Sequence, residues 1–122
     1  MINAGAITAH SLVGPETLGP AHRLDRVIAG LSAFAGRQLE MDEAVCRSEM
    51  KHAYRNFAIA NMLRSHSILN EDPSTVVDGY TRQCSLLVTT RDLAVMAATL
   101  ANRGVNPSPI NGSCPNPSYA KC

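Results

Sequence analysis

Residues 72–87 read DPSTVVDGYTRQCSLL, and this stretch predicts a helix that is buried on one side. Asp72 suits the position that caps a helix N-terminus, and Pro73 suits the first helical turn, where no backbone N–H is needed. Side chains that can be buried then recur at i, i+1, i+4, i+8 and i+11: Val76, Val77, Tyr80, Cys84 and Leu87. This spacing is typical of an amphipathic helix packed against a core. The run from Leu86 to Thr89 is interpreted as the end of that helix rather than as a strand.

Similar signals recur outward from this stretch and predict about five helices between residues 4 and 104. Besides residues 72–87, four segments carry capping residues or a 3.6-residue apolar period. They are one between Pro20 and Gly36, a short one from Asp42 to Glu49, a longer one over about residues 50–65, and one from Thr89 or Thr90 to Gly104. Clean strands are hard to find. The fold is therefore expected to be mainly α-helical.

The composition limits the class of protein. A chain of 122 residues makes one domain at most, and 45% apolar with 17% charged residues is typical of a globular chain. The net charge of +1 and the absence of a basic run give no support for binding nucleic acid or an anionic membrane. No segment approaches the roughly 18 apolar residues of a membrane span, and the amino terminus has no signal-peptide pattern. A cytoplasmic protein is expected.

Cysteine and histidine residues form no metal-binding pattern. The four cysteines, Cys46, Cys84, Cys114 and Cys122, are widely spaced without a C-x-x-C pair, so free thiols are favoured over a zinc site or a disulfide framework. The histidines are isolated as well. Phosphate-binding glycine loops are absent, so no nucleotide is implied. We expect no metal and no cofactor.

The carboxyl end changes in character. Residues 105–122 read VNPSPINGSCPNPSYAKC, with four prolines and no apolar period. This composition predicts a tail rather than a folded element. We therefore divide the chain into a folded part, residues 1–106, and a Pro-rich tail, residues 107–122.

Three stretches carry a resemblance to a known family: MINAGAI at the start, SEMKHAYRNFAIANML from Ser48, and YTRQCSLLVTTRDLAVMAATLANRGVNP from Tyr80. In order and in spacing, including the seven positions from Glu49 to Asn56, they resemble the serine-dependent glutaminases. The resemblance covers residues 1 to about 107. It implies that residues 1–106 are a mainly helical fragment of a β-lactamase/transpeptidase-like α/β fold, and that the tail does not belong to the family.

The resemblance implies hydrolysis of L-glutamine to L-glutamate and ammonia. In the family a Ser-x-x-Lys pair upstream of the N-A-G-A block does the chemistry: the serine attacks the amide carbon and the lysine takes its proton. Ser48 and Lys51 match this pattern formally, but the family alignment assigns their stretch to substrate binding, so the match is interpreted as accidental. The sheet and the nucleophile region are expected to be missing, as in a truncated or frame-shifted product.

Four residues match the substrate-binding positions of the family: Asn3, Glu49, Asn56 and Tyr80. L-glutamine carries an ammonium, a carboxylate and an amide, so its site needs a fixed anion and neutral polar groups. The resemblance assigns the α-ammonium to Glu49, a charge-assisted contact of about 1.5–3 kcal/mol. The asparagines would supply amide donors and acceptors, and the Tyr80 phenol would donate a hydrogen bond or a proton.

Structural alternatives exist for each of these residues: Glu49 paired with Arg47 or Lys51, Asn3 as a helix cap, Asn56 as an exposed helical asparagine and Tyr80 as a core aromatic. Alternatives exist for the whole chain as well. A different serine amidohydrolase of the superfamily fits the three stretches less well than a glutaminase. A non-catalytic helical interaction or oligomerisation module remains open, and homo-oligomers are implied for the full-length family.

Overall fold

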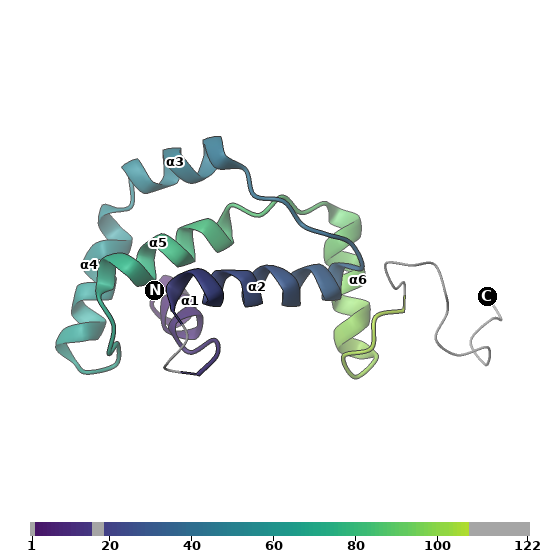
Figure 1. Ribbon diagram of the computed structural model, residues 1–122, viewed down its shortest axis with the longest axis horizontal. Coiled ribbons are helices and arrows are strands. Elements are labelled where there is room, and N and C mark those ends of the chain that lie inside the picture. The colour runs from purple at the N-terminus through teal and green to yellow at the C-terminus, as the bar shows by residue number, and fades with distance from the viewer. Residues whose placement is uncertain (1, 16–18, 108–122) are drawn as a thin grey trace. The chain divides into compact units, whose positions relative to one another are not determined.

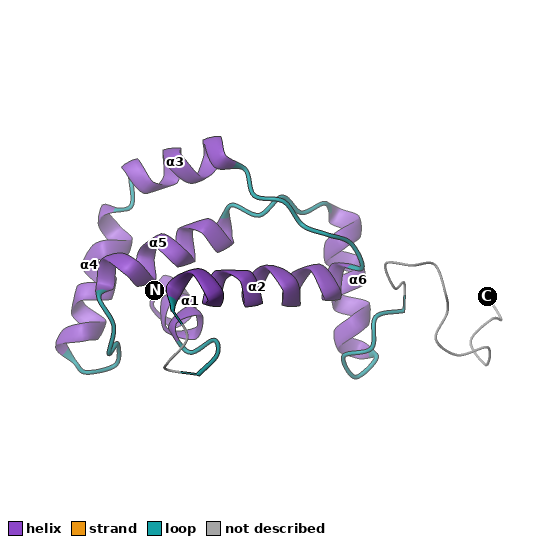
Figure 2. Cartoon of the chain, in the orientation of Figure 1, coloured by secondary structure: helices purple, strands orange, loops and turns teal. Residues whose placement is uncertain are grey.

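The computed structural model describes residues 2–15 and 19–107, and its elements are α-helices (Figures 1 and 2). In chain order these are α1 (Ile2–Ser11), α2 (Pro20–Ala35), α3 (Glu43–Lys51), α4 (Tyr54–Ser65), α5 (Pro73–Cys84) and α6 (Thr90–Ala101). The described residues contain no strand, only an isolated antiparallel bridge between Met41 and Leu86. The mainly helical prediction is confirmed, with six helices rather than about five. None of the described helices has the length and hydropathy to span a bilayer.

The predicted capping residues begin the helices. Asp42 caps α3, where its carboxylate accepts hydrogen bonds from two backbone N–H groups at 2.9 Å. Asp72 caps α5 directly before Pro73. At the start of α6, Thr89 and Asp92 form a reciprocal capping box. Each cap satisfies N–H groups that a helix leaves unpaired and stabilises the helix by about 1 kcal/mol.

The two helices predicted from Asp42 to Glu49 and over about residues 50–65 are confirmed as α3 and α4, with the boundary between them at residues 52–53 rather than near residue 50. Helix α3 ends at Lys51, and α4 begins at Tyr54. His52 ends α3 with its N–H bonded to the carbonyl of Glu49, three residues back, rather than to the carbonyl four residues back. The change to this tighter turn interrupts the helical ladder and gives α4 its own direction.

Two further boundaries differ from the prediction. Helix α1 starts at Ile2, so Asn3 lies within its first turn and is not a cap before Ala4. Helix α5 ends at Cys84, so residues 86–89 are not a helix end. Leu86 instead pairs with Met41, because an extended neighbour offers it a backbone partner. The predicted tail, apart from Pro107, lies outside the described residues.

The described chain forms two compact units. The first comprises the residues up to Val27 together with Met41–Leu86, and the second comprises Ile28–Glu40 and the described residues from Leu87 onward. All four residues matched to substrate binding belong to the first unit.

The core of the first unit forms where α1, α4 and α5 meet. Ile7 from α1, Ala60 from α4, and Val76 and Val77 from α5 are completely buried. The buried apolar residues of this core are Ile7, Ala53, Ile59, Ala60, Leu63, Leu69, Val76 and Val77. Full burial of a valine or isoleucine side chain contributes about 1.5–3 kcal/mol. Apolar burial therefore holds α1 against two helices that follow much later in the sequence.

The second unit is held together by polar contacts of α6. The Arg37 guanidinium donates two hydrogen bonds, of 2.8 and 2.6 Å, to the carboxylate of Asp92. These bonds, together with the Thr89 backbone N–H, hold the pKa of Asp92 well below its usual range. Further along α6, the Thr99 hydroxyl donates to the backbone carbonyl of Phe34 at 3.1 Å. The unit thus joins the end of α2 to α6.

Helices α1 and α5 approach closely where the His10 imidazole lies on Gly79. A Cβ atom at position 79 would stand 2.5 Å from Nε2 of His10, so glycine is required there. The other ring nitrogen, Nδ1, lies 2.8 Å from Oε1 of Gln83, one turn further along α5. Because an amide oxygen only accepts, Nδ1 donates and Nε2 carries the lone pair. Burial lowers the pKa of His10, and the Gln83 hydrogen bond partly offsets this effect.

We predict that Gly79→Ala destabilises the protein although alanine is the better helix former. The added methyl group meets the buried imidazole, and overpacking of this kind costs about 1–3 kcal/mol. Gly30→Ala in α2 is the matched control, because a Cβ there has nothing within 4 Å. It should stabilise the protein by about 0.5–1 kcal/mol. Urea unfolding of the two variants checks the prediction, and equal effects would contradict it.

We predict a loss of stability below neutral pH that depends on His10. The folded-state pKa of this buried histidine is lower than its ordinary value of 6.5. The neutral His10 side chain therefore contributes fully to the free energy of unfolding above pH 6.5. This contribution is lost as the pH falls from 6.5 toward the folded-state pKa, because in that range the unfolded chain binds the proton and the folded chain does not. The free energy of unfolding between about pH 7.5 and about pH 5.5 measures this. His10→Gln should flatten the dependence, whereas His22→Gln, at an exposed position, should leave it intact.

Candidate functional site

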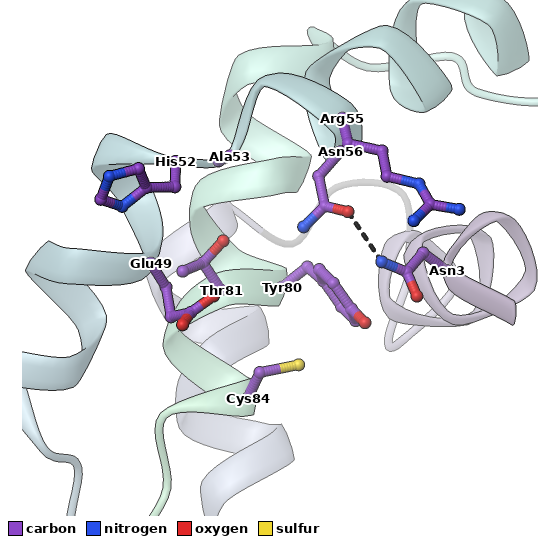
Figure 3. A pocket seen from close by; sticks show the side chains of 9 residues that line it. All are labelled: Asn3, Glu49, His52, Ala53, Arg55, Asn56, Tyr80, Thr81 and Cys84. Carbon is purple, nitrogen blue, oxygen red and sulfur yellow. Dashed lines mark hydrogen bonds between the residues drawn. The ribbon is translucent and has the colours of Figure 1, made fainter.

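All four residues matched to substrate binding line one pocket of the first unit (Figure 3). The pocket has a volume of about 180 Å³, whereas pockets that bind drug-sized ligands measure about 300–1,000 Å³. It therefore suits a molecule the size of an amino acid. Helix α1, the segment from α3 to α4, and helix α5 contribute its lining residues, which are Asn3, Glu49, His52, Ala53, Arg55, Asn56, Tyr80, Thr81 and Cys84.

The two asparagines meet across the pocket. Nδ2 of Asn3 donates a hydrogen bond of 2.9 Å to Oδ1 of Asn56, and both side chains are half-buried. The bond joins α1 to α4. It uses one donor and one acceptor, so Oδ1 of Asn3 and Nδ2 of Asn56 are left for a ligand. The pair thus presents an acceptor and a donor without a net charge.

Glu49 brings a negative charge to the pocket from the last turn of α3. Within the part of the chain that the structure describes, its carboxylate forms no ion pair, so the pairing with Arg47 or Lys51 is absent. A carboxylate at a helix C-terminus is disfavoured by the negative end of the helix dipole. Glu49 is therefore an exposed anion that a cationic ligand group would stabilise.

Tyr80 points its ring into the pocket from α5 and also packs against the core of the first unit. Its burial, together with the neighbouring Cys84 one turn later, raises the pKa of Tyr80 to about 12. The phenol consequently keeps its proton at neutral pH. In this state it can donate a hydrogen bond to an oxygen atom of a ligand, but it is not a base.

The sequence as a whole also matches a known family. The profile of the Glutaminase family matches residues 1–118. The chain belongs to the glutaminase family. The six helices are accordingly a helical part of the glutaminase fold.

Individual glutaminases agree with this assignment. Glutaminase 2 of Bradyrhizobium diazoefficiens is 54% identical over 107 residues, which make up 88% of this chain and 17% of that relative. The glutaminase of Mycobacterium ulcerans is 49% identical over 107 residues, 88% of this chain and 33% of the relative. The crystal structure of Mglu in its glutamate form is similar with a TM-score of 0.84 at 41% identity, over 92% of this chain and 25% of that one. The chain therefore spans a third or less of the length of these glutaminases.

Sequence reasoning missed several residues of the pocket. Cys84 follows Tyr80 by four positions, so helical spacing could have indicated it, whereas Thr81, one position after Tyr80, gives no such signal. The hydroxyl of Thr81 already donates to the carbonyl of Val77 at 2.8 Å. Arg55 is the most consequential omission, because it adds a positive charge to the pocket. Its position depends on the break between α3 and α4, which the prediction placed near residue 50 and the structure places at residues 52–53.

The formal Ser-x-x-Lys pair does not join the pocket. Ser48 and Lys51 lie on α3 with exposed side chains, and neither is among the lining residues. A second occurrence of the pattern, Ser118 and Lys121, lies outside the described residues. No group of three or more histidine, cysteine or acidic side chains that could hold a metal occurs in residues 2–15 and 19–107.

We predict that the purified chain releases no ammonia from L-glutamine above the blank, because neither Ser48 nor Lys51 lines the pocket that would hold the amide. A coupled ammonia assay checks this. Turnover that disappears in Ser48→Ala, or in Ser118→Ala, would contradict the prediction and would identify that serine as the nucleophile.

Proposed function

We propose that this chain supplies substrate-binding residues of a glutaminase, the hydrolase that converts L-glutamine and water into L-glutamate and ammonia. The observation that carries the proposal is the convergence of Asn3, Glu49, Asn56 and Tyr80 on one small pocket. These residues come from distant parts of the sequence, and each brings the chemical group that an amino-acid substrate needs. The relative solved in its glutamate form supports a ligand of this class.

Each side chain then has a role set by its charge and hydrogen-bonding capacity. The Glu49 carboxylate holds the α-ammonium, which is the cationic group of L-glutamine at neutral pH. Oδ1 of Asn3 accepts from, and Nδ2 of Asn56 donates to, the polar groups of the substrate. The Tyr80 phenol, protonated at neutral pH, donates to a substrate oxygen.

Hydrolysis itself requires a nucleophile, which the resemblance assigns to a Ser-x-x-Lys pair. In that scheme the serine attacks the side-chain amide carbon and the lysine takes the serine proton. The residues of this pocket bind and orient the amino-acid end of the substrate, so that the amide carbon has a fixed position. The scheme needs no metal or organic cofactor.

Other features of the proposal come from the sequence. We propose that residues 1–106 form a partial glutaminase domain and that residues 107–122 form a tail, into which the family match continues as far as residue 118. A cytoplasmic location and assembly as a homo-oligomer likewise stay predictions.

We predict that Glu49→Gln weakens the binding of L-glutamine to the chain about tenfold or more, because it keeps the shape of the side chain but removes its charge. A loss of about 1.4 kcal/mol already corresponds to tenfold. Glutaramate, which lacks the α-ammonium, should bind weakly and equally to both proteins. Isothermal titration calorimetry gives both dissociation constants.

Glu43→Gln is the matched control, since Glu43 is an exposed carboxylate on the same helix that does not line the pocket. It should leave the dissociation constant for L-glutamine unchanged. The role of Glu49 is refuted if the two variants behave alike, or if Glu49→Gln weakens L-glutamine and glutaramate to the same extent.

A further inference from the structure

We propose that Arg55 is a specificity-determining residue of the pocket, which binds the α-carboxylate of the amino-acid substrate. The inference rests on the proposed function, because it assigns the second charge of the same substrate. It concerns a residue that neither the sequence pattern nor the resemblance indicated.

One carboxylate and one guanidinium line the pocket, and they form no ion pair with each other. Glu49 and Arg55 both line it, yet among the described residues neither side chain takes part in an ion pair. Figure 3 shows them on opposite sides, with Glu49 near Thr81 and the Arg55 guanidinium extending toward Asn3. Two separated, unpaired charges of opposite sign match a ligand that carries both an ammonium and a carboxylate.

The break between α3 and α4 creates this arrangement. In one continuous helix, side chains six positions apart would be separated by about 240° around the axis. Glu49 and Arg55 would then face different directions. Because α3 ends at Lys51 and α4 begins at Tyr54, both side chains reach the same pocket. The adjacent Asn56 is fixed by its hydrogen bond to Asn3, which orients the first turns of α4.

The chemistry of the guanidinium suits a carboxylate. Its planar group offers two parallel N–H donors, which match the two oxygen atoms of a carboxylate. A lysine ammonium would act only as a point charge. With Glu49 on the ammonium and Arg55 on the carboxylate, the pocket reads both substituents of the α-carbon. It therefore discriminates against amides that lack the α-carboxylate.

The test compares two ligands and three variants of the chain by isothermal titration calorimetry. L-glutamine carries the α-carboxylate, and 4-aminobutanamide is the same molecule without it. Arg55→Gln removes the charge, Arg55→Lys keeps the charge without the planar fork, and Arg47→Gln is the control. Arg47 is an exposed arginine of α3 that does not line the pocket.

We expect Arg55→Gln to weaken L-glutamine binding about tenfold or more, because it removes the positive charge. Arg55→Lys should weaken binding less, because it keeps the charge and loses only the two parallel donors. Arg47→Gln should leave L-glutamine binding unchanged. The dissociation constant of 4-aminobutanamide should be the same in all four proteins. Circular dichroism verifies that each variant is folded. If Arg55→Gln does not fold, the dissociation constants of the two ligands for Arg55→Lys decide whether Arg55 binds the α-carboxylate.

Three results would overturn the role assigned to Arg55. They also distinguish a failure of this role from a failure of the proposed function. If the unsubstituted chain binds L-glutamine and Arg55→Gln binds it equally well, Arg55 has no role while the pocket assignment stands. If Arg47→Gln weakens binding as much as Arg55→Gln, the effect is general electrostatic attraction. If the unsubstituted chain binds neither ligand, the proposed function fails, and the inference fails with it.

Discussion

The contact of His10 with Gly79 is the constraint on which the first unit depends. It sets how closely α1 and α5 approach, because the imidazole occupies the space that a side chain at position 79 would need. On α1, Asn3, Ile7 and His10 follow one another at helical spacing along one side. The same face thus carries a pocket residue, a fully buried core residue and the contact itself. Fixing His10 on α5 therefore also fixes the end of α1 that reaches the pocket.

A second consequence appears along α5. Gly79 and Gln83 both contact His10, while Tyr80 and Cys84 line the pocket, each pair separated by one helical turn. Adjacent stripes of one helix thus serve helix packing and ligand contact. The protonation state of His10 belongs to the same arrangement, because a neutral ring donates to Gln83 and needs no counter-ion when buried. Helix packing and pocket geometry are for this reason coupled in the first unit.

The polar groups of the pocket divide into satisfied and unsatisfied ones. The amides of Asn3 and Asn56 bond to each other, so each side chain has one hydrogen-bonding partner within the protein. The charges of Glu49 and Arg55 form no ion pair among the described residues, although pairing would neutralise both. Exposed ion pairs contribute little to stability, usually below about 1 kcal/mol, so keeping these charges apart costs the fold little. Their separation instead gives the pocket polarity, which a zwitterionic ligand can use.

Much of this protein was determined by its sequence alone. The caps at Asp42, Asp72 and Thr89 and the apolar stripe through Val76 and Val77 are local signals, because a helix start depends on residues within one turn. The three motif stretches likewise indicated the family and four residues that line one pocket. Tertiary structure alone decided the rest. The approach of His10 to Gly79 and the bond between Asn3 and Asn56 join groups that are 69 and 53 positions apart in the sequence. No local period encodes such contacts, so the place of Arg55 in the pocket followed only from how α3 and α4 pack around α1 and α5.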